Sequence, residues 1–150
     1  MRRTEYDHAI NKYHHRFLDD RFKDLMISRA DAPFLHKIVK AGNQIKMNDL
    51  IEKLFFHKSH ATRSINRMVD DGLIIKETNP DDLRGYVLTA TEKGKQVAKQ
   101  IKQIFEDWDN LVSQAITDEE RKVLQNMTIK IYHLLQEYYD EEDTVSEINI

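Results

Sequence analysis

One segment, residues 58–71, concentrates side chains that can form directed hydrogen bonds with a nucleic acid. It contains no Gly or Pro, and its apolar residues fall on one helical face: Ala61, Ile65, Met68 and Val69. The opposite face carries hydroxyl, imidazole, amide and guanidinium groups, from Ser59, His60, Arg63, Asn66 and Arg67. Arginine and asparagine can form bidentate hydrogen bonds with guanine and adenine edges in a major groove. This face therefore predicts a DNA-reading helix.

The elements expected around this helix have the order of a helix-turn-helix followed by a β-hairpin wing. A shorter helix precedes it from Met47, and Gly72 supplies the left-handed residue that commonly ends a helix. Two segments rich in β-branched and aromatic residues follow, at 73–78 and 86–91, and turn residues separate them. An amphipathic helix with a solvated polar face, beside an ordinary hairpin, is the competing interpretation. The order and the spacing favour DNA binding.

At these residues the chain resembles the MarR family of bacterial winged-helix regulators. The matching residues are Thr62-Arg63, Arg67 with Gly72-Leu73-Ile74, Asp82-Leu83-Arg84 in the wing, and Leu88-Thr89 with Gly94. The resemblance covers nearly the whole chain. Three positions depart from the family pattern. Phe55-Phe56 replace a common Gly in the motif's turn, Leu83 replaces a common Arg in the wing, and Lys46 replaces the Thr that usually opens the first motif helix.

The resemblance implies a mostly α-helical fold with a small β-hairpin wing, and a dimeric repressor that binds double-stranded DNA at a palindromic operator. The residues expected in the major groove are Ser59, His60, Thr62, Arg63, Asn66 and Arg67, and Lys58 is also expected to bind DNA. Arg84 is expected to reach the minor groove from the wing. Asp82 resembles a family residue that orients arginines of the wing or the recognition helix, so it is given a supporting role.

The resemblance also implies a small aromatic or amphipathic effector that binds between the dimerisation helices and the winged-helix core. Candidate residues to contact it are Tyr13, His14, Phe17 and Phe34. The competing interpretation is that these four side chains belong to the protein core. Composition does not decide between the two.

Charge is distributed unevenly along this chain of 150 residues. Its formal net charge is −3, but residues 34–102 hold 13 Lys and Arg against 8 Asp and Glu. Local charge governs affinity for phosphate, so the overall acidity is compatible with DNA binding. The absence of Cys excludes disulfides and thiolate zinc sites. No apolar run is long enough to span a membrane, which predicts a cytoplasmic protein.

The N-terminal part predicts two helices and a short strand. The first helix is expected over residues 5–29, with an apolar seam of Tyr6, Ile10, Tyr13 and Phe17. The second is expected to begin at Asp31, whose side chain can cap it, with Pro33 in its first turn, and to end at Gly42. Residues 43–46 suggest a strand beside the wing.

Two long helices are expected after the wing, at 92–115 and 117–139, each with apolar residues at heptad-like spacing. Thr117 and Glu120 form a capping box for the second. These helices and the first one would form a dimerisation module, at residues 1–30 and 92–139, around a DNA-binding core at 34–91. A monomeric helical bundle is the alternative. The acidic segment 140–150 is expected to form a flexible tail.

Other classes of function find less support. No strand-turn-helix nucleophile elbow surrounds any Ser, so we do not expect an enzyme. His8 and His15 share a helical face and could bind a metal weakly, which leaves a metal-responsive regulator open, although solvated histidines fit better and no metal site or cofactor is predicted. A winged-helix module that binds another protein is a further alternative.

Overall fold

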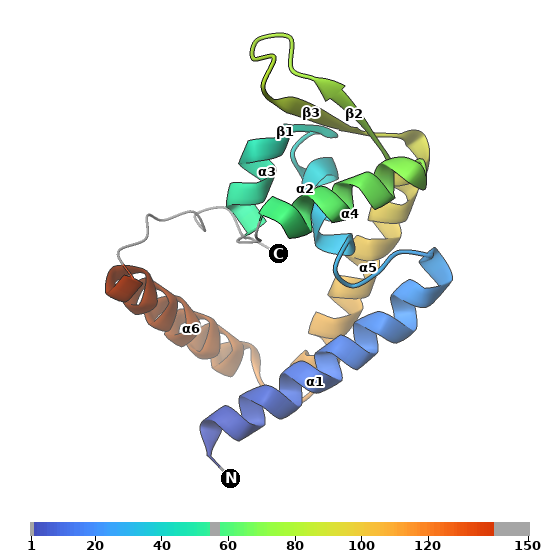
Figure 1. Ribbon diagram of the computed structural model, residues 1–150. Coiled ribbons are helices and arrows are strands. Elements are labelled where there is room, and N and C mark those ends of the chain that lie inside the picture. Colours follow the sequence, from blue (N-terminus) through green and yellow to red (C-terminus); the bar gives the residue numbers. More distant parts are fainter. Residues whose placement is uncertain (1, 55–57, 140–150) are drawn as a thin grey trace. The chain divides into compact units, whose positions relative to one another are not determined.

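The computed structural model describes residues 2–54 and 58–139, which fall into two compact units, Met1–Glu106 and Asp107–Ile150. In the first unit a small antiparallel sheet packs with helices, as predicted (Figure 1). Its elements are α1 (Arg3–Phe22), η1 (Lys23–Leu25), α2 (Ala32–Lys40), β1 (Gln44–Lys46), α3 (Met47–Leu54), α4 (Lys58–Asp70), β2 (Ile74–Thr78), β3 (Tyr86–Ala90) and most of α5 (Glu92–Ser113). The second unit contains the end of α5 and α6 (Asp118–Tyr139).

The sheet has the order β1-β3-β2, and both of its strand pairs are antiparallel. β1 corresponds to the strand expected at 43–46, and it pairs with β3 of the wing through Ile45 and Leu88. Both of these side chains are buried. The β2–β3 hairpin extends beyond the helices of the core (Figure 1). Residues 55–57 between α3 and α4, which include the Phe55-Phe56 pair that departs from the family pattern, lie outside the described residues.

The first helix is shorter than predicted. α1 ends at Phe22, and the chain continues through a 3₁₀ turn to Met26, whose φ of 54° places it in the left-handed region. The predicted end at residue 29 was therefore wrong, since a left-handed residue stops an α-helix. Only the C-terminal part of α1 joins the core, through the buried Leu18 and Phe22.

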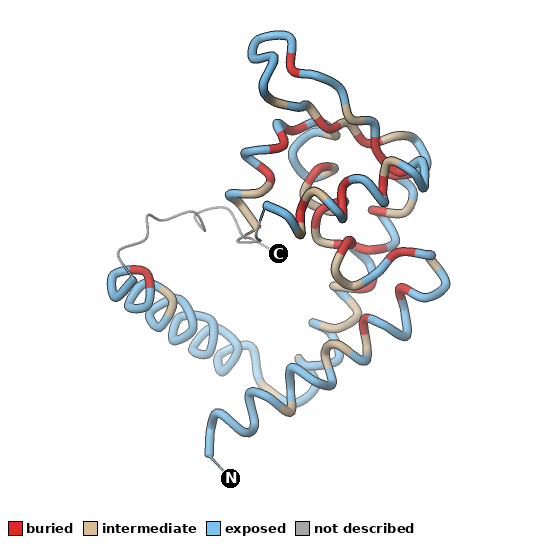
Figure 2. Tube along the Cα trace, in the orientation of Figure 1, coloured by how far each residue is buried: buried red, intermediate tan, exposed pale blue. Residues whose placement is uncertain are grey.

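The core of the first unit is formed by the apolar faces of its helices and by the inner face of the sheet (Figure 2). The fully buried large side chains include Phe34, Leu35 and Ile38 of α2, Leu50 of α3, Ile65 of α4 and Ile101 of α5. The 3.6-residue periodicity of α2 and α4 thus produced the expected packing, with α4 held by one apolar face.

A polar junction joins the end of α4 to the beginning of α5. The N–H of Leu73 donates to the carbonyl of Met68 (2.9 Å), and Gly72 has a φ of +72°, which together end α4 in a Schellman motif. The hydroxyl of Thr91 donates to the carbonyl of Gly72 (2.6 Å) and accepts the N–H of Gly94 (3.0 Å). One side chain therefore satisfies backbone groups at the ends of two helices.

This junction corrects one motif assignment. Thr89 had been matched with Gly94, but the threonine that contacts Gly94 is Thr91. The hydroxyl of Thr89 instead accepts a hydrogen bond from Nε2 of Gln44 on β1 (3.2 Å). The spacing of three residues between Thr91 and Gly94 suits an N-cap, whereas the spacing of five from Thr89 does not.

The second unit is mainly α6, and its beginning is as predicted. The N–H of Glu120 donates to the Thr117 hydroxyl (3.2 Å), and the N–H of Thr117 donates to the Glu120 carboxylate (2.8 Å), which is a capping box. Most of α6 is exposed (Figure 2), including its large apolar residues Val123, Leu124, Met127, Ile129, Ile131, Leu134, Leu135, Tyr138 and Tyr139. Within the described ranges, no helix is both long and apolar enough to cross a bilayer.

We expect Gly94→Ala to destabilise the protein by about 2–3 kcal/mol, because its methyl group would overlap the backbone carbonyl of Leu73, which cannot move without disturbing the end of α4. Gly85→Ala is the matched control. A methyl group there meets its nearest atom at 3.6 Å, so the free energy of unfolding should change by less than about 1 kcal/mol. Denaturant unfolding at one protein concentration measures both. Equal stabilities for the two variants would contradict the close contact at Gly94.

Candidate nucleic-acid interface

Helix α4 divides cleanly into a buried face and an exposed face. Ala61, Ser64, Ile65 and Met68 are buried against the core. Five of the predicted DNA-contacting residues on α4 are exposed, namely Lys58, Ser59, Arg63, Asn66 and Arg67. Among the described residues, Arg63 has no carboxylate within ion-pair distance. The guanidinium of Arg63 and the amide of Asn66 are thus presented to solvent by a helix whose other face is fixed.

Two of the other predicted residues are less exposed. The hydroxyl of Thr62 donates to the carbonyl of Lys58 (2.8 Å), so its proton is directed back along the helix. His60 is half-buried, and its ring centroid lies 6.0 Å from that of the buried Phe34. Thr62 therefore offers chiefly an acceptor oxygen, and His60 lies at the edge of the core.

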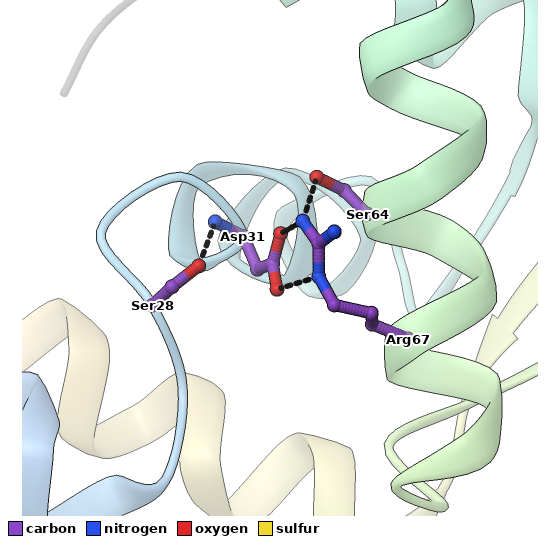
Figure 3. Close-up of polar contacts among 4 residues, drawn as sticks. All are labelled: Ser28, Asp31, Ser64 and Arg67. Atoms are coloured by element: carbon purple, nitrogen blue, oxygen red, sulfur yellow. Dashed lines mark hydrogen bonds and ion pairs between the residues drawn. The ribbon is translucent and has the colours of Figure 1, made fainter.

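Arg67 lies in a different environment, because it forms a bidentate ion pair with Asp31 (Figure 3). Nε of Arg67 donates to one carboxylate oxygen at 3.0 Å, and Nη2 donates to the other at 2.7 Å. Nη2 also donates to the hydroxyl of Ser64 (3.2 Å). The Asp31 side chain is 8% exposed and that of Arg67 is 51% exposed, so the pair extends from the interior to the surface.

Burial and the neighbouring donors have opposite effects on the pKa of Asp31. Burial alone would raise the pKa of Asp31, but hydrogen bonds from Arg67 and Ser64, with the positive charge of Arg67, lower that pKa below its ordinary value. The pKa of Arg67 is raised, chiefly by its hydrogen bonds to Asp31. Both groups therefore remain charged at neutral pH, and the pair is held as an ion pair rather than as neutral partners.

The position of Asp31 corrects a second prediction. Asp31 precedes α2 as expected, but its side chain makes no capping hydrogen bond to the helix. The carboxylate is instead directed to Arg67, which is 36 residues away in the sequence. The backbone N–H of Asp31 donates to the hydroxyl of Ser28 at 3.0 Å. Pro33 occupies the first turn of α2, as predicted.

The tip of the wing is held by its own hydrogen bonds. The N–H of Asn79 donates to the carbonyl of Gly85 (2.9 Å), and the buried Asn79 side chain accepts the N–H of Asp81 (3.0 Å). The carboxylate of Asp82 accepts the backbone N–H of Arg84 (3.1 Å). Asp82 therefore orders the loop, and in the part of the chain described it forms no ion pair with an arginine side chain.

The exposed residues of the tip include the adjacent Leu83 and Arg84, and Leu83 is 81% exposed. A charged group and an apolar group are thus presented together on an ordered turn.

Known proteins share this architecture. The sequence pattern of the MarR family matches residues 27–85, which include α2, α4 and the wing tip. The HTH-type transcriptional regulator BilQ of Clostridioides difficile (strain CD3) is 34% identical over 99 residues, which are 66% of this chain and 64% of that protein. The chain is therefore similar in sequence to the MarR family.

Solved MarR structures agree in fold. A mutant MarR from E. coli, complexed with operator DNA, has a TM-score of 0.76 at 24% identity, over 85% of this chain and 91% of that one. The S. aureus MepR–DNA complex has a TM-score of 0.82 at 14% identity, and the match covers 89% of this chain and 98% of that one. The matched regions cover less than two thirds of the BilQ proteins' own length, 64% in C. difficile and 51% in Clostridium symbiosum.

The four effector candidates occupy unlike environments in this chain. Phe34 is completely buried in the core, which fits the competing interpretation of a packing residue. Phe17 is partly buried against the core, His14 is half-buried, and Tyr13 is 64% exposed. Among residues 2–54 and 58–139, no group of three or more potential ligands is placed to hold a metal ion.

Helical periodicity missed the two residues that hold Arg67. Ser64 is a small polar residue within the apolar face of α4, and its spacing of three from Arg67 was the available signal. Asp31 had only a local signal, that of a helix cap, which concealed its contact with α4. The MarR motif itself gave no indication of this pair, because its residues lie in separate segments.

Asp31→Asn should lower the free energy of unfolding at neutral pH by about 1–3 kcal/mol, since it leaves Arg67 without a charged partner. Because the pKa of Asp31 is lowered on folding, its stabilisation is present above the ordinary value of 3.8 and is lost as pH falls further. The difference in free energy of unfolding between the wild type and Asp31→Asn should therefore become smaller below about pH 4. Denaturant unfolding from pH 7 to pH 3 measures it.

Asp19→Asn serves as the control, since Asp19 forms an exposed ion pair with Arg29 (3.1 Å) and should contribute less than about 1 kcal/mol. If the free energies of unfolding of Asp31→Asn and wild type differed by the same amount from pH 7 to pH 3, the ion pair between Asp31 and Arg67 would not be the source of the stabilisation.

Proposed function

We propose that this chain is a transcriptional regulator that binds double-stranded DNA as a homodimer and represses from a palindromic operator. The observation that carries the proposal is the exposed face of α4, where Arg63 and Asn66 are presented by a helix fixed on its other side. Two kinds of comparison support it. The BilQ proteins are named as HTH-type transcriptional regulators, and the E. coli MarR mutant and S. aureus MepR structures are complexes with DNA.

An alternative to DNA contact is that Arg63 and Arg84 are ordinary surface charges in ion pairs. Among the described residues Arg63 and Arg84 pair with none of Asp70, Asp71 and Asp82. A guanidinium without an intramolecular partner can approach a guanine edge or a phosphate without first breaking an ion pair. This supports a DNA-contacting role for both residues.

The wing contributes a second contact in the proposal. Its tip is ordered by hydrogen bonds from Asn79 and Asp82, so Arg84 is presented on a turn that does not need to fold on binding. A guanidinium at this position can enter a narrow minor groove and respond to its negative potential. Leu83 adds no charge here, so we assign one cationic contact to each wing.

The homodimer accounts for the exposed apolar side chains outside the core. On α1, Tyr6, Ile10 and Tyr13 are each more than half exposed, and α6 exposes apolar residues along most of its length. Contiguous apolar surface of this kind marks a protein–protein interface. We assign a second copy of this chain as the partner, because a two-fold symmetric dimer places two α4 helices on a palindromic site.

Release by a small aromatic or amphipathic effector remains a prediction of the family resemblance. The exposed Tyr13 and half-buried His14 and Phe17 are compatible with it, whereas Phe34 serves the core. The metal-responsive alternative gains no support from the described residues.

Sedimentation at micromolar concentration should show a dimer of 17.8 kDa chains. Leu134→Glu should shift the protein toward monomer, because it places a charge within the exposed apolar surface of α6. Asn126→Glu introduces the same charge at a polar exposed position of that helix and should leave the dimer intact. A folded monomer for the wild type, independent of concentration, would contradict the homodimer.

Arg63→Ala should weaken operator binding by roughly 1–3 kcal/mol and relax base preference at one position in each half-site. The half-site centres should lie about 10 base pairs apart. Arg84→Ala should weaken operator and unrelated DNA more evenly, and should reduce the salt-dependence slope by about one unit. The operator sequence is first identified by selection from a random pool of DNA. The affinity of both variants for operator and unrelated DNA is then measured by titration at several salt concentrations. Full affinity and selectivity of Arg63→Ala would show that α4 does not read DNA.

A further inference from the structure

The ion pair between Arg67 and Asp31 sets Arg67 apart from the other polar residues of α4 (Figure 3). We propose that Arg67 is a positioning residue, which fixes the orientation of the recognition helix by binding Asp31, and that it does not contact DNA. The inference rests on the proposed function, since it assigns roles within the same DNA-reading helix. It reverses the prediction from the sequence, which placed Arg67 in the major groove.

The first argument is the state of the guanidinium. Two of its three nitrogens are occupied, with Nε and Nη2 donating to the two oxygens of one carboxylate at 3.0 and 2.7 Å. To contact a phosphate or a base with these groups, Arg67 would have to leave Asp31. That would strand a carboxylate that is 8% exposed and charged, which is strongly unfavourable.

The second argument is directional. Ala61, Ile65 and Met68 pack one face of α4 against the core through apolar contacts, and the hydrophobic effect that drives such contacts is non-directional. A bidentate arginine–carboxylate pair has a fixed planar geometry. Arg67 is one turn from Arg63 and adjacent to Asn66, so the pair fixes the part of α4 that carries the proposed reading residues.

The third argument is the segment on which Asp31 stands. Its backbone N–H is held by the Ser28 hydroxyl, and its carbonyl accepts the N–H groups of Phe34 and Leu35 at the start of α2. Asp31 is thus fixed to the connection between η1 and α2. The pair therefore joins the recognition helix to the segment that follows α1.

The test compares Asp31→Asn with Arg67→Gln in operator binding, at a temperature where circular dichroism shows both variants fully folded. If Arg67 positions α4, each substitution should weaken operator binding by about 5-fold to 150-fold, and the double variant should lose little more. If Arg67 contacts DNA, the two substitutions should have opposite signs. Arg67→Gln would weaken binding, whereas Asp31→Asn would strengthen it by releasing Arg67 and removing a negative charge.

Two further readouts separate positioning from simple loss of stability. The slope of affinity against salt should stay unchanged in Arg67→Gln, because Asp31 already neutralises this charge, whereas a lost phosphate contact would lower the slope by about one unit. Arg67→Lys keeps the charge but cannot form the bidentate pair, so it should bind the operator almost as weakly as Arg67→Gln. Full rescue by lysine would overturn the proposal.

Arg63→Gln on the same helix is the matched control. Arg63 forms no ion pair with any described residue, so Arg63→Gln should weaken operator binding by removing a direct contact. Its effect should be smaller in the Asp31→Asn background, because that variant has already lost the orientation of α4 on which the Arg63 contact depends. Unchanged operator affinity in both Asp31→Asn and Arg67→Gln would overturn the positioning role while leaving the proposed function standing. Absence of DNA binding by the wild type would instead overturn the proposed function.

Discussion

The contact between the end of α4 and the beginning of α5 constrains the rest of the first unit. The backbone of Gly94 lies against the carbonyl of Leu73, and Thr91 hydrogen-bonds to groups of both helices. Between these residues the chain leaves α4, forms the β2–β3 hairpin and returns. Because both ends of the wing are fixed at this contact, the position of the wing is fixed relative to α4. The sheet then adds β1 through Gln44 and Thr89, which carries the constraint to α3.

A second, polar constraint acts on the other side of α4. The carboxylate of Asp31 is removed from water, and its charge is retained because Arg67 and Ser64 surround it with donors. Burial of a charge is costly, so such a pair gives orientation at the expense of stability that apolar residues could have supplied. The exposed half of α4 contrasts with this. Arg63 and Asn66 make no comparable contact in the described chain, so the same helix combines a fixed polar contact with polar groups open to solvent.

Local signals predicted most of the fold, and non-local contacts account for what they missed. Gly72 and the capping box at Thr117 depend on neighbours within a few residues, so the sequence was sufficient to predict the ends of α4 and the start of α6. Met26 carries no such signal, because neither Gly nor Asn, the residues that usually adopt a left-handed conformation, stands at that position. At the candidate site, periodicity identified the exposed face of α4, but it could not show that a residue 36 positions away binds Arg67. Pairing at that distance is a property of the tertiary structure.

The hydrogen bonds at the wing tip also determine how much the hairpin can vary in length. The N–H of Asn79 and the carbonyl of Gly85 close the loop, and the side chains of Asn79 and Asp82 bind backbone groups two residues further on. Each of these bonds depends on a fixed count of residues. An inserted or deleted residue between Asn79 and Gly85 would break the closure, and a shift of one position along β3 would exchange its inward and outward side chains. Diversity at this tip is therefore confined to side chains such as Leu83, while the length of the loop is held constant.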